Sequence, residues 1–252
     1  MLRFCPDATI LDISHQVPRY SIRDGAATLV FALPYMPVGI HVAVVDPGVG
    51  TDRLAVALRT GRGDILIGPD NGLLIAAGEA LGGIVEARSL DNRELMLGDV
   101  SNSFHGRDVF APVAGHLASG VAFETVGPTV PVARLVRLPE VRPTIRDGAL
   151  ESVIVHVLIY GNVTFAGTPA DLEAAIGPLR RGRPIALEFP AHDGAPAVEE
   201  RTVWARTFGD VPLGASLLYS DSEGNLALAD NQGDAARRLG LALERPVRIR
   251  AA

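Results

Sequence analysis

Apolar, β-branched runs alternate with turn residues along the first half of the chain. They predict buried strands at residues 9–14, 40–46, 54–60, 64–70 and 83–90. Two stretches have helical spacing instead: residues 23–36 are rich in alanine, and residues 110–120 end in Gly120, which suits a C-terminal cap. Strands that alternate with helices are typical of an α/β layer structure, and near-continuous apolar strands indicate a sheet covered on both faces. We therefore expect a mostly parallel sheet flanked by helices.

The pattern changes at residues 135–148, which hold two prolines and charges of both signs with little periodicity, as an interdomain linker does. Strand-like runs follow at 151–165, 183–190, 201–208, 215–230 and 245–251, and only 169–179 and 233–243 have helical spacing. The sequence thus predicts an α/β domain over residues 1–140 and a smaller, mostly β, barrel-like domain over residues 149–252.

Composition narrows the class of protein. A hydrophobic content of 48% with 21% charged residues is ordinary for a globular protein, and a net charge of −6 attracts neither nucleic acid nor an anionic membrane. All 23 basic residues are arginine, which excludes a Schiff-base or P-loop lysine. Cys5 is the only cysteine, so no internal disulfide forms. Without a signal peptide or an apolar run of membrane-spanning length, we expect a cytoplasmic protein.

Polar residues follow two of the predicted strands. Asp46 ends the run 40–46 and precedes a glycine-rich turn that closes at Arg53. In open α/β sheets, ligands bind beyond the carboxyl ends of strands, although a turn aspartate that accepts backbone N–H bonds would give the same pattern. Asp70 and Asn71 repeat the arrangement in PDNG, where an ordinary turn is equally compatible.

His105 lies in the polar stretch SFHGRD, residues 103–108, directly before a predicted helix. Its neighbour Gly106 makes it a poor core residue, which favours a role in a site. Asp108 is expected to cap the helix and to pair with Arg107. The chain has no H-x-H, HExxH or cysteine pair, so we expect no metal site.

Taken together, these motifs resemble a known family, the S-adenosyl-L-methionine hydrolases. These enzymes are also called SAM hydroxide adenosyltransferases and are relatives of the fluorinase and the chlorinase. The resemblance covers nearly the whole chain in five segments: DISHQVPRYSIRDGAATL, VVDPGVGTDR, GPDNGLL, SFHGRDVFAPVAGHLASG and SEGNLALADNQGDAARRLGL. It implies an enzyme in which water attacks ribose C5′ of S-adenosyl-L-methionine and releases adenosine and L-methionine without a cofactor.

The resemblance also implies roles for individual residues. Asp46, Arg53 and His105 would surround the attacking water, with either Asp46 or His105 as the base. Substrate contacts are implied for Phe104, Gly106, Asp70, Asn71, Tyr160, Asn162, Ser222, Glu223, Asp230 and Gln232. The stretch around Ser222 would otherwise be a plain β-hairpin. A homotrimer is implied, with each site between the N-terminal domain of one subunit and the C-terminal domain of its neighbour.

Two alternatives to hydrolysis follow from how the chain compares with this family. The halide-using relatives carry tyrosine at the position of Asp46, and a carboxylate there would repel a halide, so a halide-dependent adenosyl transferase is disfavoured. The family's first strand and helix, with an aspartate that holds the ribose, have no counterpart here, and Val157 and Leu158 stand where an aspartate contacts the methionine amino group. These departures favour a nucleoside- or SAM-binding protein with little turnover.

Without the first strand, we also expect an open sheet edge or a gap.

Overall fold

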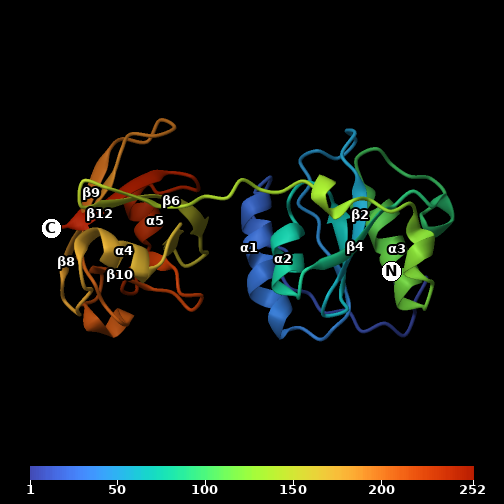
Figure 1. Cartoon of the computed structure of the whole chain (residues 1–252), viewed down its shortest axis with the longest axis horizontal. Coiled ribbons are helices and arrows are strands. Elements are labelled where there is room, and N and C mark those ends of the chain that lie inside the picture. Colours follow the sequence, from blue (N-terminus) through green and yellow to red (C-terminus); the bar gives the residue numbers. More distant parts are fainter. The chain divides into compact units, whose positions relative to one another are not determined.

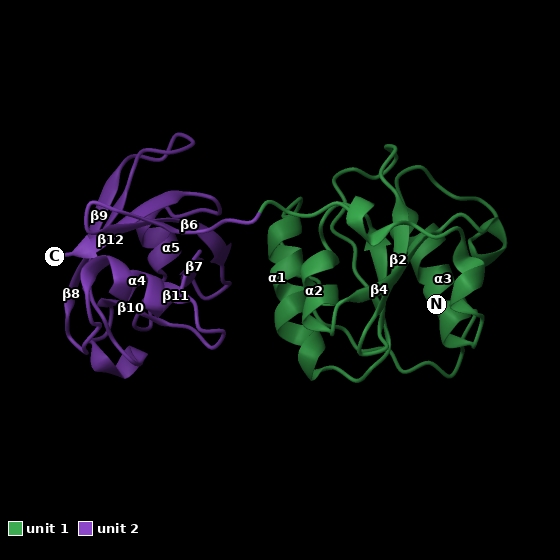
Figure 2. Ribbon diagram, in the orientation of Figure 1, with its two compact units in different colours: residues 1–139 green, residues 140–252 purple.

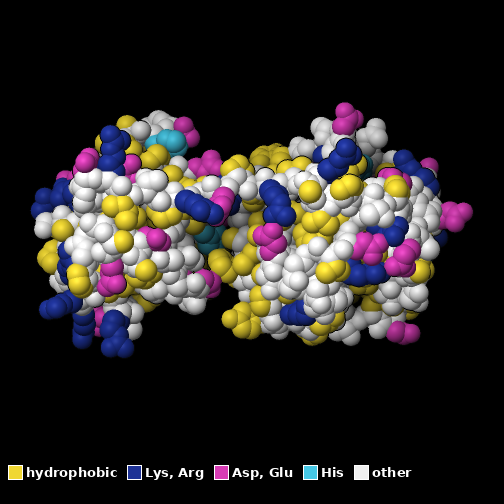
Figure 3. All heavy atoms as spheres, in the orientation of Figure 1, with side chains coloured by type: hydrophobic (Ala, Val, Ile, Leu, Met, Phe, Trp, Pro, Cys, Tyr) yellow, Lys and Arg dark blue, Asp and Glu magenta, His cyan; other side chains and the backbone are white.

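The computed structural model describes residues 1–252, which divide into two compact units, residues 1–139 and residues 140–252 (Figure 2). No helix in either unit has the length and apolar character that crossing a membrane requires. On the face that Figure 3 shows, arginine and carboxylate side chains are interspersed over the surface of each unit. This mixed surface agrees with the modest net charge of the sequence.

The N-terminal unit contains a four-stranded mixed sheet. Its strands are β1 (Ile40–Val42), β2 (Ala55–Thr60), β3 (Ile65–Pro69) and β4 (Ile84–Ser89), in the order β1-β3-β2-β4. Only β1 and β3 are parallel, and β2 pairs antiparallel with both of its neighbours. The predicted mostly parallel sheet is therefore wrong. The four residues 61–64 between β2 and β3 are enough for a hairpin, whereas a parallel connection needs a crossover of a dozen residues or more.

Helices cover both faces of this sheet (Figure 1). Helices α1 (Ile22–Ala32) and α2 (Ile75–Ala80) share a core with alternate strand residues such as Val56, whereas α3 (Ala111–Ala118) packs with the intervening ones, such as Ala57. The predicted helices at 23–36 and 110–120 are confirmed, and Gly120 follows α3 with φ +96°. A π-helical turn, residues Gly106–Phe110, precedes α3 and was not predicted.

The strand predicted at residues 9–14 is not formed. These residues instead line a cavity of about 800 Å³, and β1 borders the same cavity. Strand β1 lies at the edge of the sheet, because β3 is its only partner. An extended segment needs a hydrogen-bonded neighbour to become part of a sheet, and residues 9–14 pair with no strand. The unpaired edge of β1 therefore borders this cavity.

The C-terminal unit is a nearly closed antiparallel sheet, as predicted. Its strands are β5 (Thr144–Arg146), β6 (Ala149–Val157), β7 (Val163–Phe165), β8 (Pro184–Phe189), β9 (Val198–Val203), β10 (Ser216–Ser220), β11 (Leu226–Asp230) and β12 (Pro246–Ala251). They run in the order β10-β11-β7-β6-β12-β8-β9, with β5 also paired to β6. A single bridge between Trp204 and Leu218 joins the two ends of this order, so the sheet curls into a barrel.

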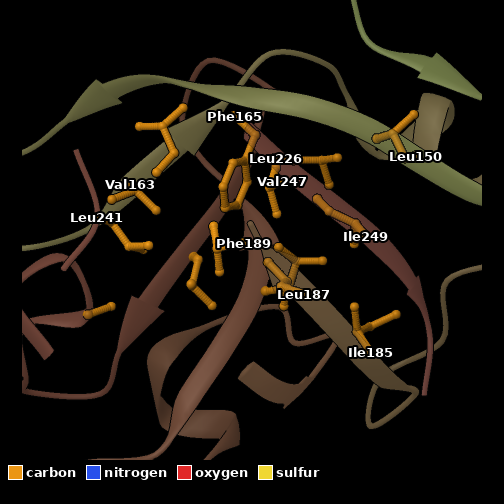
Figure 4. Close-up of a cluster of buried hydrophobic side chains, with 14 of the residues drawn as sticks. Leu150, Val163, Phe165, Ile185, Leu187, Phe189, Leu226, Leu241, Val247 and Ile249 are labelled. Carbon is orange, nitrogen blue, oxygen red and sulfur yellow. The ribbon is translucent and has the colours of Figure 1, made fainter. Parts of the chain in front are cut away.

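Inward-facing side chains fill the barrel, among them Phe165, Leu187, Phe189 and Val247 (Figure 4). Helix α4 (Pro169–Ile176) begins with a capping box, and α5 (Ala235–Leu239) ends at a left-handed glycine. The strand predicted at 201–208 begins earlier than expected, because residues 198–203 pair with β8 and the chain leaves the sheet after them. The strand-like run predicted at 215–230 is confirmed and forms the hairpin of β10 and β11.

Candidate active site

Two polar turns meet where the parallel strands β1 and β3 end. The chain beyond β1 stays paired to β3, since the Ala43 N–H donates to the Ile67 carbonyl at 3.0 Å. The Asn71 side-chain amide, which follows β3, donates to the Val45 carbonyl at 2.9 Å. Asn71 therefore holds the residue that directly precedes Asp46. The carboxyl ends of neighbouring parallel strands carry the candidate residues, as expected for an α/β site.

The glycine-rich turn brings Arg53 back onto Asp46. Arg53 Nε donates to Asp46 Oδ1 at 3.0 Å, and Nη2 donates to Oδ2, so the pair is bidentate. Both side chains are buried, with 4% of Asp46 and 10% of Arg53 exposed. Within the turn, Gly50 has φ +82°, and a Cβ there would lie 2.8 Å from the Asn102 carbonyl oxygen. Glycine is required at this position on both counts.

His105 completes a line of three side chains. Its Nδ1 lies 2.9 Å from Arg53 Nη2. A guanidinium has no acceptor and stays protonated, so Nδ1 must accept this bond, and His105 is the neutral tautomer with its proton on Nε2. Burial, and then the charge of Arg53, lower the pKa of His105 from its ordinary value of 6.5, which Asp46 and Asp108 oppose in part. Charge and geometry thus agree on a neutral imidazole.

The buried ring of Phe110 contacts both Arg53 and His105. The Phe110 centroid lies 5.5 Å from Arg53 Cζ and 6.5 Å from the His105 ring, which meets it edge-on. Cation–π and edge-on contacts of this kind fix the planes of both groups. Phe110 was not among the predicted site residues, because in the sequence it is only the first apolar residue of a helical pattern.

The other predicted residues of the N-terminal unit surround these three side chains in different ways. Gly106 faces Val44, and Phe104 lies on the surface with Arg107 stacked 4.9 Å from its centroid. Asp70 is buried and accepts the Val136 N–H at 2.9 Å, and burial raises the pKa of its carboxyl. Asp70 thus ties the last segment of the unit to β3.

In the C-terminal unit the predicted residues form two groups at opposite ends of β11. Ser222 and Glu223 lie in the tip of the β10–β11 hairpin, where the Ser222 hydroxyl donates to Glu223 at 2.7 Å. Asp230 and Gln232 lie at the other end of β11. The turn that contains Tyr160 and Asn162 is joined to that end by pairing of β7 with β11 and by a bond of 2.9 Å from the Ala236 N–H to the Gly161 carbonyl.

Arg238 binds the Asp230 side chain within its own unit. Arg238 donates to both of its oxygens, at 2.8 and 2.7 Å, and the same guanidinium reaches Glu200. Only 4% of the Asp230 side chain is exposed. Gln232 has φ +56°, an uncommon backbone conformation for a residue other than glycine.

The cavity of about 800 Å³ reaches Asp46 and has the size of a small-molecule site. Arg19 and Tyr20 line it, and Tyr20 has φ +68°, a strained conformation for an aromatic residue. No pattern of residues indicates a site role for either of them, because PRYS simply precedes a helix. No group of three His, Cys, Asp or Glu side chains in the chain has metal-site geometry.

Together, Asp46, Arg53 and His105 place a carboxylate, a fixed positive charge and a neutral N–H donor in one hydrogen-bonded set. A carboxylate has about four acceptor positions, of which Arg53 occupies two, so Asp46 can still accept a proton or a hydrogen bond. His105 retains its Nε2–H as a donor. The set can orient and deprotonate a small polar nucleophile.

Comparison with known proteins covers nearly the entire chain. The family model described as the SAM hydroxide adenosyltransferase N-terminal domain matches residues 1–127, and the model of the C-terminal domain matches residues 153–248. The chain is 45% identical over 243 residues to the (R)-S-adenosyl-L-methionine hydrolase of Salinispora tropica, covering 96% of this chain and 86% of the relative.

Two further matches have lower sequence identity. The chain is 29% identical over 258 residues to the fluorinase of Actinoplanes sp., covering 92% of this chain and 84% of that protein. A crystal structure of an uncharacterised conserved protein from Thermotoga maritima matches with a TM-score of 0.83 at 32% identity, over 99% of this chain and 91% of the other. The fluorinase is thus the more distant relative.

Proposed function

The chain belongs to the SAM hydroxide adenosyltransferase family, and from that premise we propose that it hydrolyses S-adenosyl-L-methionine to adenosine and L-methionine. The observation that carries the proposal is the buried, hydrogen-bonded set of Asp46, Arg53 and His105, together with 45% identity to a hydrolase of this substrate.

The reaction is a displacement at ribose C5′. A lone pair of the water oxygen forms a bond to C5′, and the bond from C5′ to sulfur breaks with its electrons going to sulfur. The leaving group is the neutral thioether of methionine, so departure needs no acid. The site has only to align the water and accept one of its protons, and positioning and general-base catalysis supply this.

Within the proposal, each residue of the set has one task. Asp46 accepts the proton, because the Nδ1 lone pair of His105 is occupied by Arg53. His105 donates its Nε2–H to the water oxygen and fixes its orientation. Arg53 stays charged and stabilises the hydroxide character that develops on the water oxygen.

The substrate contacts and the assembly are part of the same proposal. Phe104, Gly106, Asp70 and Asn71 would contribute from the N-terminal unit. The C-terminal unit would contribute Tyr160, Asn162, Ser222, Glu223, Asp230 and Gln232. We further propose self-association as a homotrimer, which the molar mass in solution tests.

Halide-dependent transfer is the competing chemistry within this set of relatives. A halide site needs net positive charge, and here the charge of Arg53 is neutralised by a bidentate carboxylate. The pair therefore favours water over a halide.

The test is incubation of the purified chain with S-adenosyl-L-methionine, with and without chloride, followed by chromatography of the products. Adenosine and methionine at a rate independent of chloride support the proposal. Chlorinated nucleoside would indicate the halide reaction, and binding of the substrate without any product would indicate a protein that no longer turns over. Asp46→Asn, which keeps the shape of the side chain, is the matched control and is expected to be slower by about 10²-fold or more.

A further inference from the structure

Asp108 is a buried carboxylate outside the set that acts on water. None of its side chain is exposed, although its partner Arg107 is 61% exposed. Arg107 donates to both of its oxygens, at 2.5 and 3.0 Å, and the Ser101 N–H donates to Oδ2 at 2.9 Å. The expected helix cap is wrong, because Asp108 lies inside the π-helical turn and not at the start of α3.

The main chain of Asp108 binds the same segment as its side chain. Pro112, at the start of α3, has no N–H to offer the carbonyl four residues before it. The Asp108 carbonyl instead accepts the Leu97 N–H at 3.0 Å. Two bonds from one residue, one from each end of segment 97–101, therefore tie that segment to the π-helical turn.

The segment beyond it contacts the turn that carries Arg53. The Asn102 carbonyl oxygen lies where a side chain on Gly50 would be, so the turn around Gly50 packs directly against Asn102. His105 directly precedes the π-helical turn, and the turn contains Phe110, whose ring contacts both Arg53 and His105. Asp108 thus belongs to the π-helical turn and is hydrogen-bonded to segment 97–101, which leads directly into the residue that contacts the Gly50 turn. Single π-helical turns are frequent at functional sites.

We infer that Asp108 is a positioning residue, which holds the His105 imidazole so that Nδ1 accepts from Arg53 and Nε2–H faces the water. The inference rests on the proposed hydrolysis for its catalytic consequence, but not for its structural one. Asp108 acts through segment 97–101 and the π-helical turn and does not touch the reacting atoms.

A second buried carboxylate gives a matched control. Asp64 is also fully buried, is bound by Arg62 and accepts a backbone N–H, from Gly39 at 3.2 Å. Its histidine partner is His41, at 2.8 Å, which has no contact with Arg53. Asp64→Asn therefore matches Asp108→Asn in burial and in chemistry, and differs in being tied to another part of the sheet.

The experiment compares Asp108→Asn, Asp108→Glu and Asp64→Asn in the full chain. We expect both Asn variants to melt at lower temperature, whereas only Asp108→Asn lowers kcat, by about 10- to 100-fold with KM changed less than about threefold. Asp108→Glu should recover part of kcat. Equal loss of kcat in the two Asn variants, or no loss in either, would overturn the inference.

Nitrogen-15 NMR of the His105 imidazole provides a readout that needs no turnover. The wild-type ring should have a protonated Nε2 and a bare Nδ1, and Asp108→Asn should give averaged tautomers, with Asp64→Asn unchanged. A His105 spectrum unaffected by Asp108→Asn would overturn the inference. If the wild-type chain does not hydrolyse the substrate, the proposed function fails, and the NMR comparison alone decides the positioning role.

Discussion

Replacing Arg53 by methionine removes the cation from a buried ion pair and leaves the carboxylate behind. Asp46 is only 4% exposed, and both of its oxygens accept hydrogen bonds from Arg53. Breaking a buried pair from one side costs about 3–5 kcal/mol, because an uncompensated charge remains in a low-dielectric site. We expect Arg53→Met to lower the free energy of unfolding of residues 1–139 by this amount at neutral pH.

The double variant Arg53→Met, Asp46→Asn separates the charge from the packing. Its amide has the shape of the carboxylate but no charge, and an unpaired buried polar group costs only about 1–3 kcal/mol. The double variant should therefore be more stable than Arg53→Met alone by about 2 kcal/mol. Native-state hydrogen exchange of the β2 and β3 amides measures the N-terminal unit separately. A double variant no more stable than Arg53→Met, or a single variant within about 1 kcal/mol of wild type, would show that the unpaired charge of Asp46 does not destabilise the unit.

Three further predictions follow from other contacts. The lowered pKa of His105 keeps the ring neutral, and its protonated form would set Nδ1–H against Arg53. We therefore expect kcat/KM, which reports groups of the free enzyme, to fall on acidification with a midpoint below 6.5. The pH–rate profile checks this, and His105→Gln should lose that limb. Asn71→Ala removes the bond to the Val45 carbonyl and should lower kcat by about 10- to 100-fold in steady-state kinetics, with the fold retained. Arg245 is 1% exposed and donates to the Gly240 and Pro196 carbonyls, so Arg245→Met should destabilise residues 140–252 by about 2–4 kcal/mol in hydrogen exchange, with kcat unchanged.

Hydrophobic periodicity predicted most elements of the fold but not the pairing of the N-terminal sheet. The runs at 54–60, 64–70 and 83–90 were confirmed as strands. Their directions depend on the short turn 61–64, which permits only a hairpin, and periodicity alone does not weigh the length of a connection. The run at 9–14 has strand-like composition. A strand forms only where another segment pairs with it, and the local sequence does not show whether one does.

Contacts within the site were predictable from the sequence alone only where the residues are close together along the chain. Asp46 and Arg53 are seven positions apart across a glycine turn, and the structure joins them as a bidentate pair. The contact of Arg53 with His105 spans 52 positions, and only the family resemblance predicted it. Phe110 and Asp108 were missed as site residues because an apolar residue and a residue before a helix have ordinary structural uses. Their roles depend on the π-helical turn, which no local pattern indicates.

The most direct test of hydrolysis at C5′ is to run the reaction in water enriched in oxygen-18 and to analyse the products by mass spectrometry. We expect one labelled oxygen in the 5′-hydroxyl of adenosine and none in methionine. Label in methionine, or adenosine without label, would mean that water does not attack C5′ and would contradict the assignment of Asp46, Arg53 and His105.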